Sequence, residues 1–148
     1  MMIDSRPPSG RMSRYGMPIG QPTASAPVLV IDDEPSASDA TIELLIQGGY
    51  PTTFESDGDA VLRLVRSEVM RLVVSELYVP CTEGRCVIGA LKQDRTRLPR
   101  LRVLAYSRHV TAADDEWALA AGADAVLHKP GPSGALVREV DRLDGRSR

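Results

Sequence analysis

Residues 28–33 read Val-Leu-Val-Ile-Asp-Asp, a short apolar run that ends in two acids. The same arrangement recurs at residues 72–76, Leu-Val-Val-Ser-Glu. Two further apolar runs end in polar residues, Val-Leu-Ala-Tyr-Ser at 103–107 and Ala-Val-Leu-His-Lys-Pro at 125–130. Short, continuous apolar runs of this kind are typical of strands that are buried on both faces of a parallel sheet.

Segments with helical spacing of apolar residues separate these runs. The pattern predicts strands at 28–32, 51–55, 71–76, 101–106 and 124–128. It predicts helices over about 36–47, around 61–65, around 87–91, over about 111–121 and around 136–143. Strict alternation of five strands and five helices favours an α/β fold, a doubly wound parallel sheet of flavodoxin-like order 2-1-3-4-5. The pair Gly48-Gly49 is expected to end the first helix in a left-handed conformation.

Three acids fall at the place where such a sheet binds ligands. The crevice of this fold lies at the carboxyl ends of the first and third strands, and Asp32, Asp33 and Glu76 occupy those ends. Oxygen ligands suit a hard cation such as Mg²⁺ or Mn²⁺. A purely structural alternative is that Asp33 or Ser36 caps the following helix.

Together with Ser107 and Lys129-Pro130, these acids resemble the response-regulator receiver family of two-component signalling across residues 27–145. The resemblance implies that Glu76 stands where the family has its phosphorylated aspartate. It implies a metal held by Asp32, Asp33, Glu76 and the backbone carbonyl of Tyr78. It also implies that Lys129 contacts the phosphoryl oxygens, that the Lys129-Pro130 bond is cis, and that Ser107 is the switch hydroxyl.

Two residues depart from the family pattern. Glu76 is longer than aspartate by one methylene, which moves its carboxylate by about 1.5 Å. A displacement of about 1 Å can slow an in-line reaction about a hundredfold, so phosphotransfer onto Glu76 is expected to be slow or absent. The extended carboxylate would imitate the phosphorylated state in part, with less charge and fewer acceptor oxygens. Val126 replaces the aromatic residue whose rotation accompanies switching in the family.

These features predict a stand-alone, degenerate receiver that works by protein–protein contact and is not an enzyme. Its expected partners are a histidine kinase, a phosphotransfer protein or a downstream target in a phosphorelay. One alternative is a working receiver that accepts a phosphoryl group on Glu76 with Mg²⁺, expected to bind weakly. Another is a metal-dependent phosphohydrolase that uses Asp32 as nucleophile.

Side chains around the site support further expectations. Arg108 would either pair with Glu76 or remain exposed, and Tyr78 and His109 would overhang the pocket. Trp117 would either pack over the fifth strand or lie in an interface, since bulky aromatics are enriched there. Such an interface would form a homodimer through the fourth helix, the fifth strand and the fifth helix.

Composition narrows the class of protein. Residues 1–26 are rich in proline, glycine and serine, which predicts a disordered tail before a receiver domain at 27–145. The net charge of -2 and the lack of a Lys/Arg cluster on a predicted helix or the tail disfavour nucleic acid and membrane as partners, although a basic loop ends at Pro99. No apolar run approaches the roughly 18 residues of a membrane span, so a cytoplasmic protein is expected. Cys81 and Cys86 are expected to be free thiols.

Overall fold

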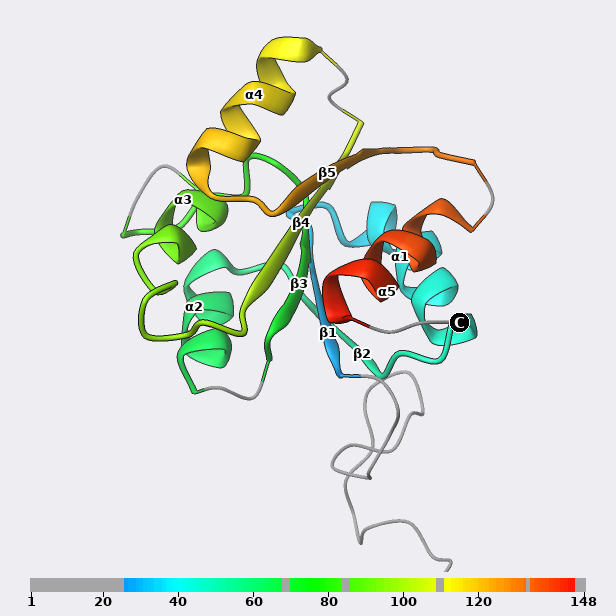
Figure 1. The fold of residues 1–148 in the computed structure, drawn as a ribbon, viewed down its shortest axis with the longest axis horizontal. Coiled ribbons are helices and arrows are strands. Elements are labelled where there is room, and N and C mark those ends of the chain that lie inside the picture. The colour runs from blue at the N-terminus through cyan, green and yellow to red at the C-terminus, as the bar shows by residue number, and fades with distance from the viewer. Residues whose placement is uncertain (1–25, 68–69, 84–85, 109–110, 133, 146–148) are drawn as a thin grey trace, which may run out of the picture.

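The computed structural model describes residues 26–67, 70–83, 86–108, 111–132 and 134–145. Five strands alternate with five helices in these segments (Figure 1). The strands are β1 (Val28–Ile31), β2 (Thr52–Glu55), β3 (Leu72–Ser75), β4 (Arg102–Ser107) and β5 (Ala125–His128). The helices are α1 (Pro35–Gln47), α2 (Gly58–Arg66), α3 (Val87–Lys92), α4 (Ala112–Ala121) and α5 (Ala135–Asp144).

The strands form one parallel sheet in the order β2-β1-β3-β4-β5, which confirms the predicted topology. In this register Val30 of β1 lies between Phe54 of β2 and Val74 of β3. Helices α1 and α5 cover one face of the sheet, and α2, α3 and α4 cover the other (Figure 1). The fold is therefore doubly wound, with β1 and β3 adjacent at its centre.

Alternate strand residues face the two helical layers. Leu29 and Val73 belong to the apolar cluster under α2, α3 and α4, whereas Val30 and Val74 belong to the cluster under α1 and α5. Successive side chains of a strand point to opposite faces, so a sheet covered on both sides requires continuous apolar strands. This explains the unbroken runs in the sequence.

The predicted left-handed end of α1 is confirmed at the second residue of the glycine pair, and two other details differ from the expectations or lie outside the described residues. Gly48 is right-handed at φ -77°, and the left-handed residue after α1 is Gly49 at φ 91°. Ser107 was expected just past its strand, but it is the last residue of β4. The predicted disordered tail lies outside the described residues except for Ala26, which is buried in the core.

The structural alternative for the acids at the end of β1 finds no support. Glu34, rather than Asp33 or Ser36, is the residue before the first turn of α1, and no side chain caps that helix. Helical segments long and apolar enough to cross a membrane do not occur within the described residues.

Candidate functional site

The acids predicted to form a site lie around one cavity at the carboxyl edge of the sheet. Because β1 and β3 pair in parallel, Glu76 follows β3 directly beside the end of β1, and its amide donates to the Ile31 carbonyl at 3.0 Å. The cavity has a volume of about 240 Å³. It is lined by Asp32, Asp33, Glu34, Ala37, Glu76, Tyr78 and Arg108.

Lys129 forms ion pairs with two of these acids, Asp32 and Glu76. Its Nζ lies 3.4 Å from Oδ2 of Asp32 and 3.5 Å from Oε2 of Glu76. The three side chains are only 11%, 5% and 17% exposed. Ions with little access to water interact more strongly than ions on an open surface. The ammonium also lies 5.2 Å from the ring centroid of Tyr106, and the Lys129-Pro130 bond is cis, as the resemblance implied.

The second oxygen of each acid accepts from the backbone. Oε1 of Glu76 accepts from the amide of Leu77 at 3.0 Å, and Oδ1 of Asp32 accepts from the amide of Glu34 at 2.9 Å. Both oxygens of Glu76 and both oxygens of Asp32 are therefore held by protein groups. This network holds both carboxylates within 3.5 Å of the Lys129 ammonium.

The residues present do not form a closed set of metal ligands. Carboxylate oxygens have the right chemistry for Mg²⁺. However, in the described part of the chain no three His, Cys, Asp or Glu side chains converge closely enough to hold a metal ion together. Lys129 contacts both Asp32 and Glu76, and places a positive charge between these two candidate ligands.

The two residues predicted to take part in switching, Ser107 and Val126, lie outside the cavity lining. Ser107 is fully buried, and its carbonyl accepts from the amide of Lys129 at 2.8 Å, so the backbone joins the ends of β4 and β5. Val126 is half-buried and packs, like Trp117, against the cluster under α2, α3 and α4.

An aromatic contact that the sequence did not predict ties the site to α4. Tyr78 and Trp117 have ring centroids 4.8 Å apart with planes inclined by 43°. The Tyr78 hydroxyl donates to Oδ1 of Asp114 at 2.5 Å. That hydrogen bond, together with burial, raises the pKa of Tyr78 to about 12. The tyrosine next to the acidic cavity is thus attached to the first turn of α4, where Thr111 caps the helix through the Asp114 amide.

The rest of the loop after β3 packs against α2. A β-carbon built at Gly58 would lie 2.1 Å from the carbonyl oxygen of Pro80, so only glycine allows this approach. Oδ1 of Asp59 accepts from the Thr82 amide and the Thr82 hydroxyl, each at 3.0 Å, and these bonds lower the pKa of Asp59. Contacts on both flanks therefore hold the loop that carries Glu76 and Tyr78.

The other residues singled out in the sequence lie in different surroundings. Arg108 lines the cavity and is exposed, and its guanidinium forms no ion pair with Glu76 in the structure as described. His109 lies outside the described residues. Cys81 and Cys86 are not joined by a disulfide; Cys86 is buried, and its sulfur accepts from the Gly89 amide at 3.5 Å in the first turn of α3.

A parallel α/β sheet with acids at the ends of β1 and β3 and a lysine at the end of β5 defines a receiver-type domain. The chain belongs to the response regulator receiver domain family, whose sequence model matches residues 28–141. Receiver domains act in two-component signalling.

Individual relatives agree with this assignment. An uncharacterized 14.6 kDa protein of Leptolyngbya boryana is 29% identical over 124 residues, covering 82% of this chain and 92% of the relative. The response regulator protein FleR of Pseudomonas aeruginosa is 29% identical over 118 residues, and the activator ExaE of Pseudomonas putida is 30% identical over 118 residues. The matches cover 80% and 78% of this chain but only 24% and 54% of those two proteins.

Solved structures share the fold. The receiver domain of NtrX from Brucella abortus has a TM-score of 0.67 at 25% identity, with 81% of this chain and 99% of that chain covered. The receiver domain of the Francisella response regulator 1452 has a TM-score of 0.69 at 23% identity, covering 84% and 100%.

Proposed function

We propose that this receiver signals by protein contact, and that Glu76 takes the place of the phosphorylated aspartate without being phosphorylated itself. The observation that carries the proposal is the contact between Glu76 and Lys129, at 3.5 Å in a site that is mostly shielded from water. The lysine that would meet an incoming phosphoryl group already has a carboxylate of the same protein beside it.

The geometry of Glu76 also disfavours phosphotransfer. Its Oε1 is bound to the Leu77 amide and its Oε2 faces Lys129. An attacking oxygen must be free to approach the phosphorus in line, and a small misplacement is costly in rate. These two contacts restrict the orientation in which either oxygen of Glu76 could approach a phosphorus atom.

The charge at Glu76 supports a biased rather than a fully switched conformation. The carboxylate brings one negative charge to Lys129, whereas a phosphoryl group brings more charge and a third oxygen. Ser107 is buried, and its carbonyl is bonded to the Lys129 amide, so a shift of the lysine would be felt at β4. We infer that Glu76 holds Lys129 close to the position that a phosphorylated site would require.

The expected partner is a signalling protein, such as a histidine kinase, a phosphotransfer protein or a downstream target. A groove of about 510 Å³ between α1 and the segment from β5 into α5 offers a surface for such contact. Its lining includes Leu44, which is 41% exposed, and extends to Arg108 and Lys129. Apolar side chains beside cations suit a helical segment that is partly acidic.

Intact-mass measurement after treatment with acetyl phosphate and Mg²⁺ tests the proposal. The wild-type protein should gain no phosphoryl group, which would add about 80 Da, whereas Glu76→Asp should gain one. Glu76→Ala is the matched control, since it removes the acceptor from the same position. An increment on the wild type that disappears in Glu76→Ala would overturn the proposal.

That outcome would support a second candidate, a phosphate-accepting receiver that uses Glu76 and Mg²⁺. The observation in its favour is that Asp32, Asp33 and Glu76 line a single cavity of about 240 Å³.

A further inference from the structure

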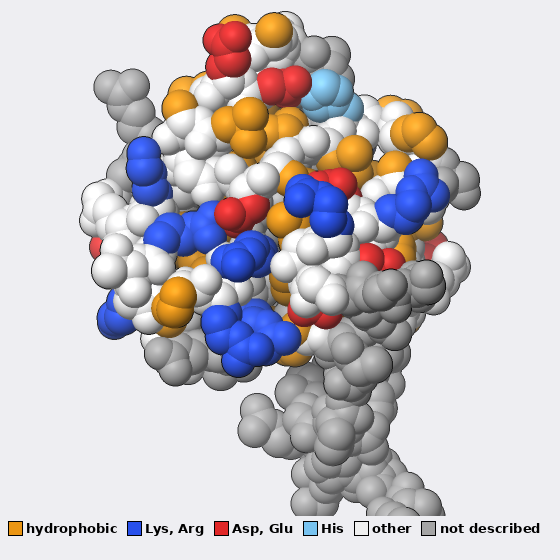
Figure 2. Space-filling model, viewed as in Figure 1, with side chains coloured by type: hydrophobic (Ala, Val, Ile, Leu, Met, Phe, Trp, Pro, Cys, Tyr) orange, Lys and Arg blue, Asp and Glu red, His pale blue; other side chains and the backbone are white. Residues whose placement is uncertain are grey.

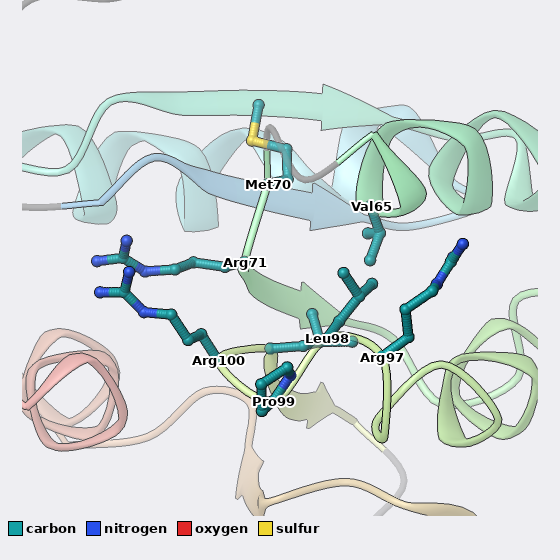
Figure 3. A pocket seen from close by; sticks show the side chains of 8 residues that line it. Val65, Met70, Arg71, Arg97, Leu98, Pro99 and Arg100 are labelled. Atoms are coloured by element: carbon teal, nitrogen blue, oxygen red, sulfur yellow. The ribbon is translucent and has the colours of Figure 1, made fainter.

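A second pocket lies at the opposite edge of the sheet, where β3 and β4 begin. Its volume is about 230 Å³, and its apolar wall is formed by Val65, Met70, Leu98 and Leu101. Figure 3 shows Val65 and Leu98 pointing toward each other across this pocket. The strand starts are joined by the Arg102 amide, which donates to the carbonyl of Arg71 at 2.8 Å, so the pocket is built on the central strands.

Three arginines surround this apolar wall. Arg71 and Arg100 extend in the same direction on one side, and Arg97 extends on the other side (Figure 3). Figure 2 shows a dense group of Lys and Arg side chains around the lower ends of β3 and β4. The protein as a whole carries a net charge of -2, so this group is a local excess of positive charge. Arg97 and Arg100 come from the basic loop before β4, and the fold adds Arg71 from the start of β3.

Nearby acids neutralise the positive charge of these arginines only in part. Arg71 lies 3.5 Å from Asp144, and Arg97 lies 3.4 Å from Asp94. Asp94 is also bound by Arg66 at 3.2 Å, so Arg97 shares its partner. Arg100 is exposed and has no ion pair with any residue that the structure describes. The acids of these pairs are shielded, with 6% of the Asp144 side chain and 11% of the Asp94 side chain exposed, whereas the Arg71 and Arg97 side chains are 42% and 61% exposed and can reach a further carboxylate.

We propose that this pocket binds an acidic peptide segment of a partner protein, with one bulky apolar side chain placed against Met70 and Leu98, which are 7% and 9% exposed, and flanking carboxylates on the arginines. The volume is smaller than the roughly 300 Å³ at which sites for drug-sized ligands begin, and it suits a single side chain. Arginine forks match carboxylates in two-point contacts. The site lies at the other end of the strands from Glu76, so the inference goes beyond the proposed function.

Titration of ¹⁵N-labelled full-length protein with three synthetic peptides tests this inference. Each peptide carries two glutamates on either side of a central leucine, phenylalanine or tryptophan, and the tryptophan peptide also has a glutamine analogue. At least one acidic peptide should shift the amide signals of Met70, Arg71 and residues 98–101. Arg97→Glu with Arg100→Glu should weaken its binding at least about tenfold, because two attractive contacts become repulsive.

Arg138→Glu with Arg142→Glu is the matched control, since it reverses two exposed arginines on α5 outside the pocket. It should leave peptide binding within about twofold of the wild type. The inference is overturned if none of the three peptides binds, if the glutamine analogue binds equally well, or if the shifted signals lie around Glu76. Binding to phosphatidylglycerol vesicles without peptide binding would also overturn it. Glu76→Asp should leave the peptide affinity unchanged, which separates this result from the test of the proposed function.

Discussion

Lys129 and Glu76 form a shielded ion pair, with Nζ 3.5 Å from Oε2 and with 11% and 17% of the two side chains exposed. Oδ2 of Asp32 lies 3.4 Å from the same ammonium. One cation therefore holds two acids that would otherwise repel each other across the crevice. The charge balance of this site depends on Lys129.

Lys129→Met should lower the free energy of unfolding at pH 7 by about 2 kcal/mol, because it leaves two shielded carboxylates without their cation. Urea denaturation followed by circular dichroism measures the loss. Adding Glu76→Gln to Lys129→Met should recover part of the lost stability, because it removes one of the two negative charges. Lys92→Met is the control, since that exposed lysine only donates to the Ala120 carbonyl, and it should cost less than about 1 kcal/mol. Equal losses for the two lysines would contradict the assignment.

Mg²⁺ should bind weakly to the wild-type protein and at least about tenfold more tightly to Glu76→Asp, a difference of about 1.4 kcal/mol. The shorter side chain withdraws one carboxylate from Lys129 and leaves room for a cation and its waters. Isothermal titration calorimetry with MgCl₂ measures both affinities. Adding Asp32→Asn to Glu76→Asp should abolish the gain in Mg²⁺ affinity. Equal affinities for the wild type and Glu76→Asp would show that the side-chain length at residue 76 does not determine Mg²⁺ affinity.

Tyr78→Phe should make the protein less sensitive to alkaline pH. The pKa of Tyr78 is raised from 10.0 to about 12 in the folded state, first by its hydrogen bond to Asp114 and then by burial. A raised pKa means that the folded protein holds this proton after the unfolded chain has lost it. The stabilisation is therefore complete below pH 10 and is lost as pH rises toward 12.

Denaturant unfolding of both proteins at pH 9, 10 and 11 checks this prediction. The difference in stability between wild type and Tyr78→Phe should shrink over this range. Asp114→Asn is the companion variant, because it weakens the hydrogen bond while keeping the phenol. A stability difference that is constant with pH would show that the hydroxyl is not held by Asp114 in solution.

Gly58→Ala and Gly89→Ala should have opposite effects. A β-carbon at Gly58 would lie 2.1 Å from the Pro80 carbonyl, so the loop after β3 must move, at a cost of about 1–3 kcal/mol. A β-carbon at Gly89, inside α3, would lie 3.7 Å from the Cys86 sulfur, an ordinary contact. Alanine is favoured over glycine inside helices, so Gly89→Ala should stabilise by about 0.5–1 kcal/mol. Thermal unfolding of the two variants gives the signs directly.

The fold followed closely from the sequence because the strands are buried on both faces. Continuous apolar runs fixed the strand positions, and alternation with helices fixed their order, which the structure confirms. The boundaries moved by one or two residues, as at Ser107, because apolar character does not mark the last hydrogen-bonded residue of a strand. The acids were brought together as expected, since adjacent parallel strands end at the same edge.

The contacts between distant side chains could not be predicted in the same way. Tyr78 and Trp117 come from a loop and a helix far apart in the sequence, and their meeting depends on the position of α4 over the sheet. Arg71 and Arg97 belong to separate segments that line one pocket only because β3 and β4 start at one edge. Sequence periodicity predicts which face a residue lies on, but it does not predict which distant residue it meets there.

The parallel register of β3 and β4 places the two proposed contact regions, around Glu76 and around the arginine-rimmed pocket, at opposite ends of the strands. Strands of four and six residues span roughly 13–20 Å, so Glu76 and the arginine-rimmed pocket are separated by the length of the sheet. Proteins bound at the two ends would not compete for the same surface. Under the two proposals above, such a receiver would serve as an adaptor that bridges two partners and brings them together.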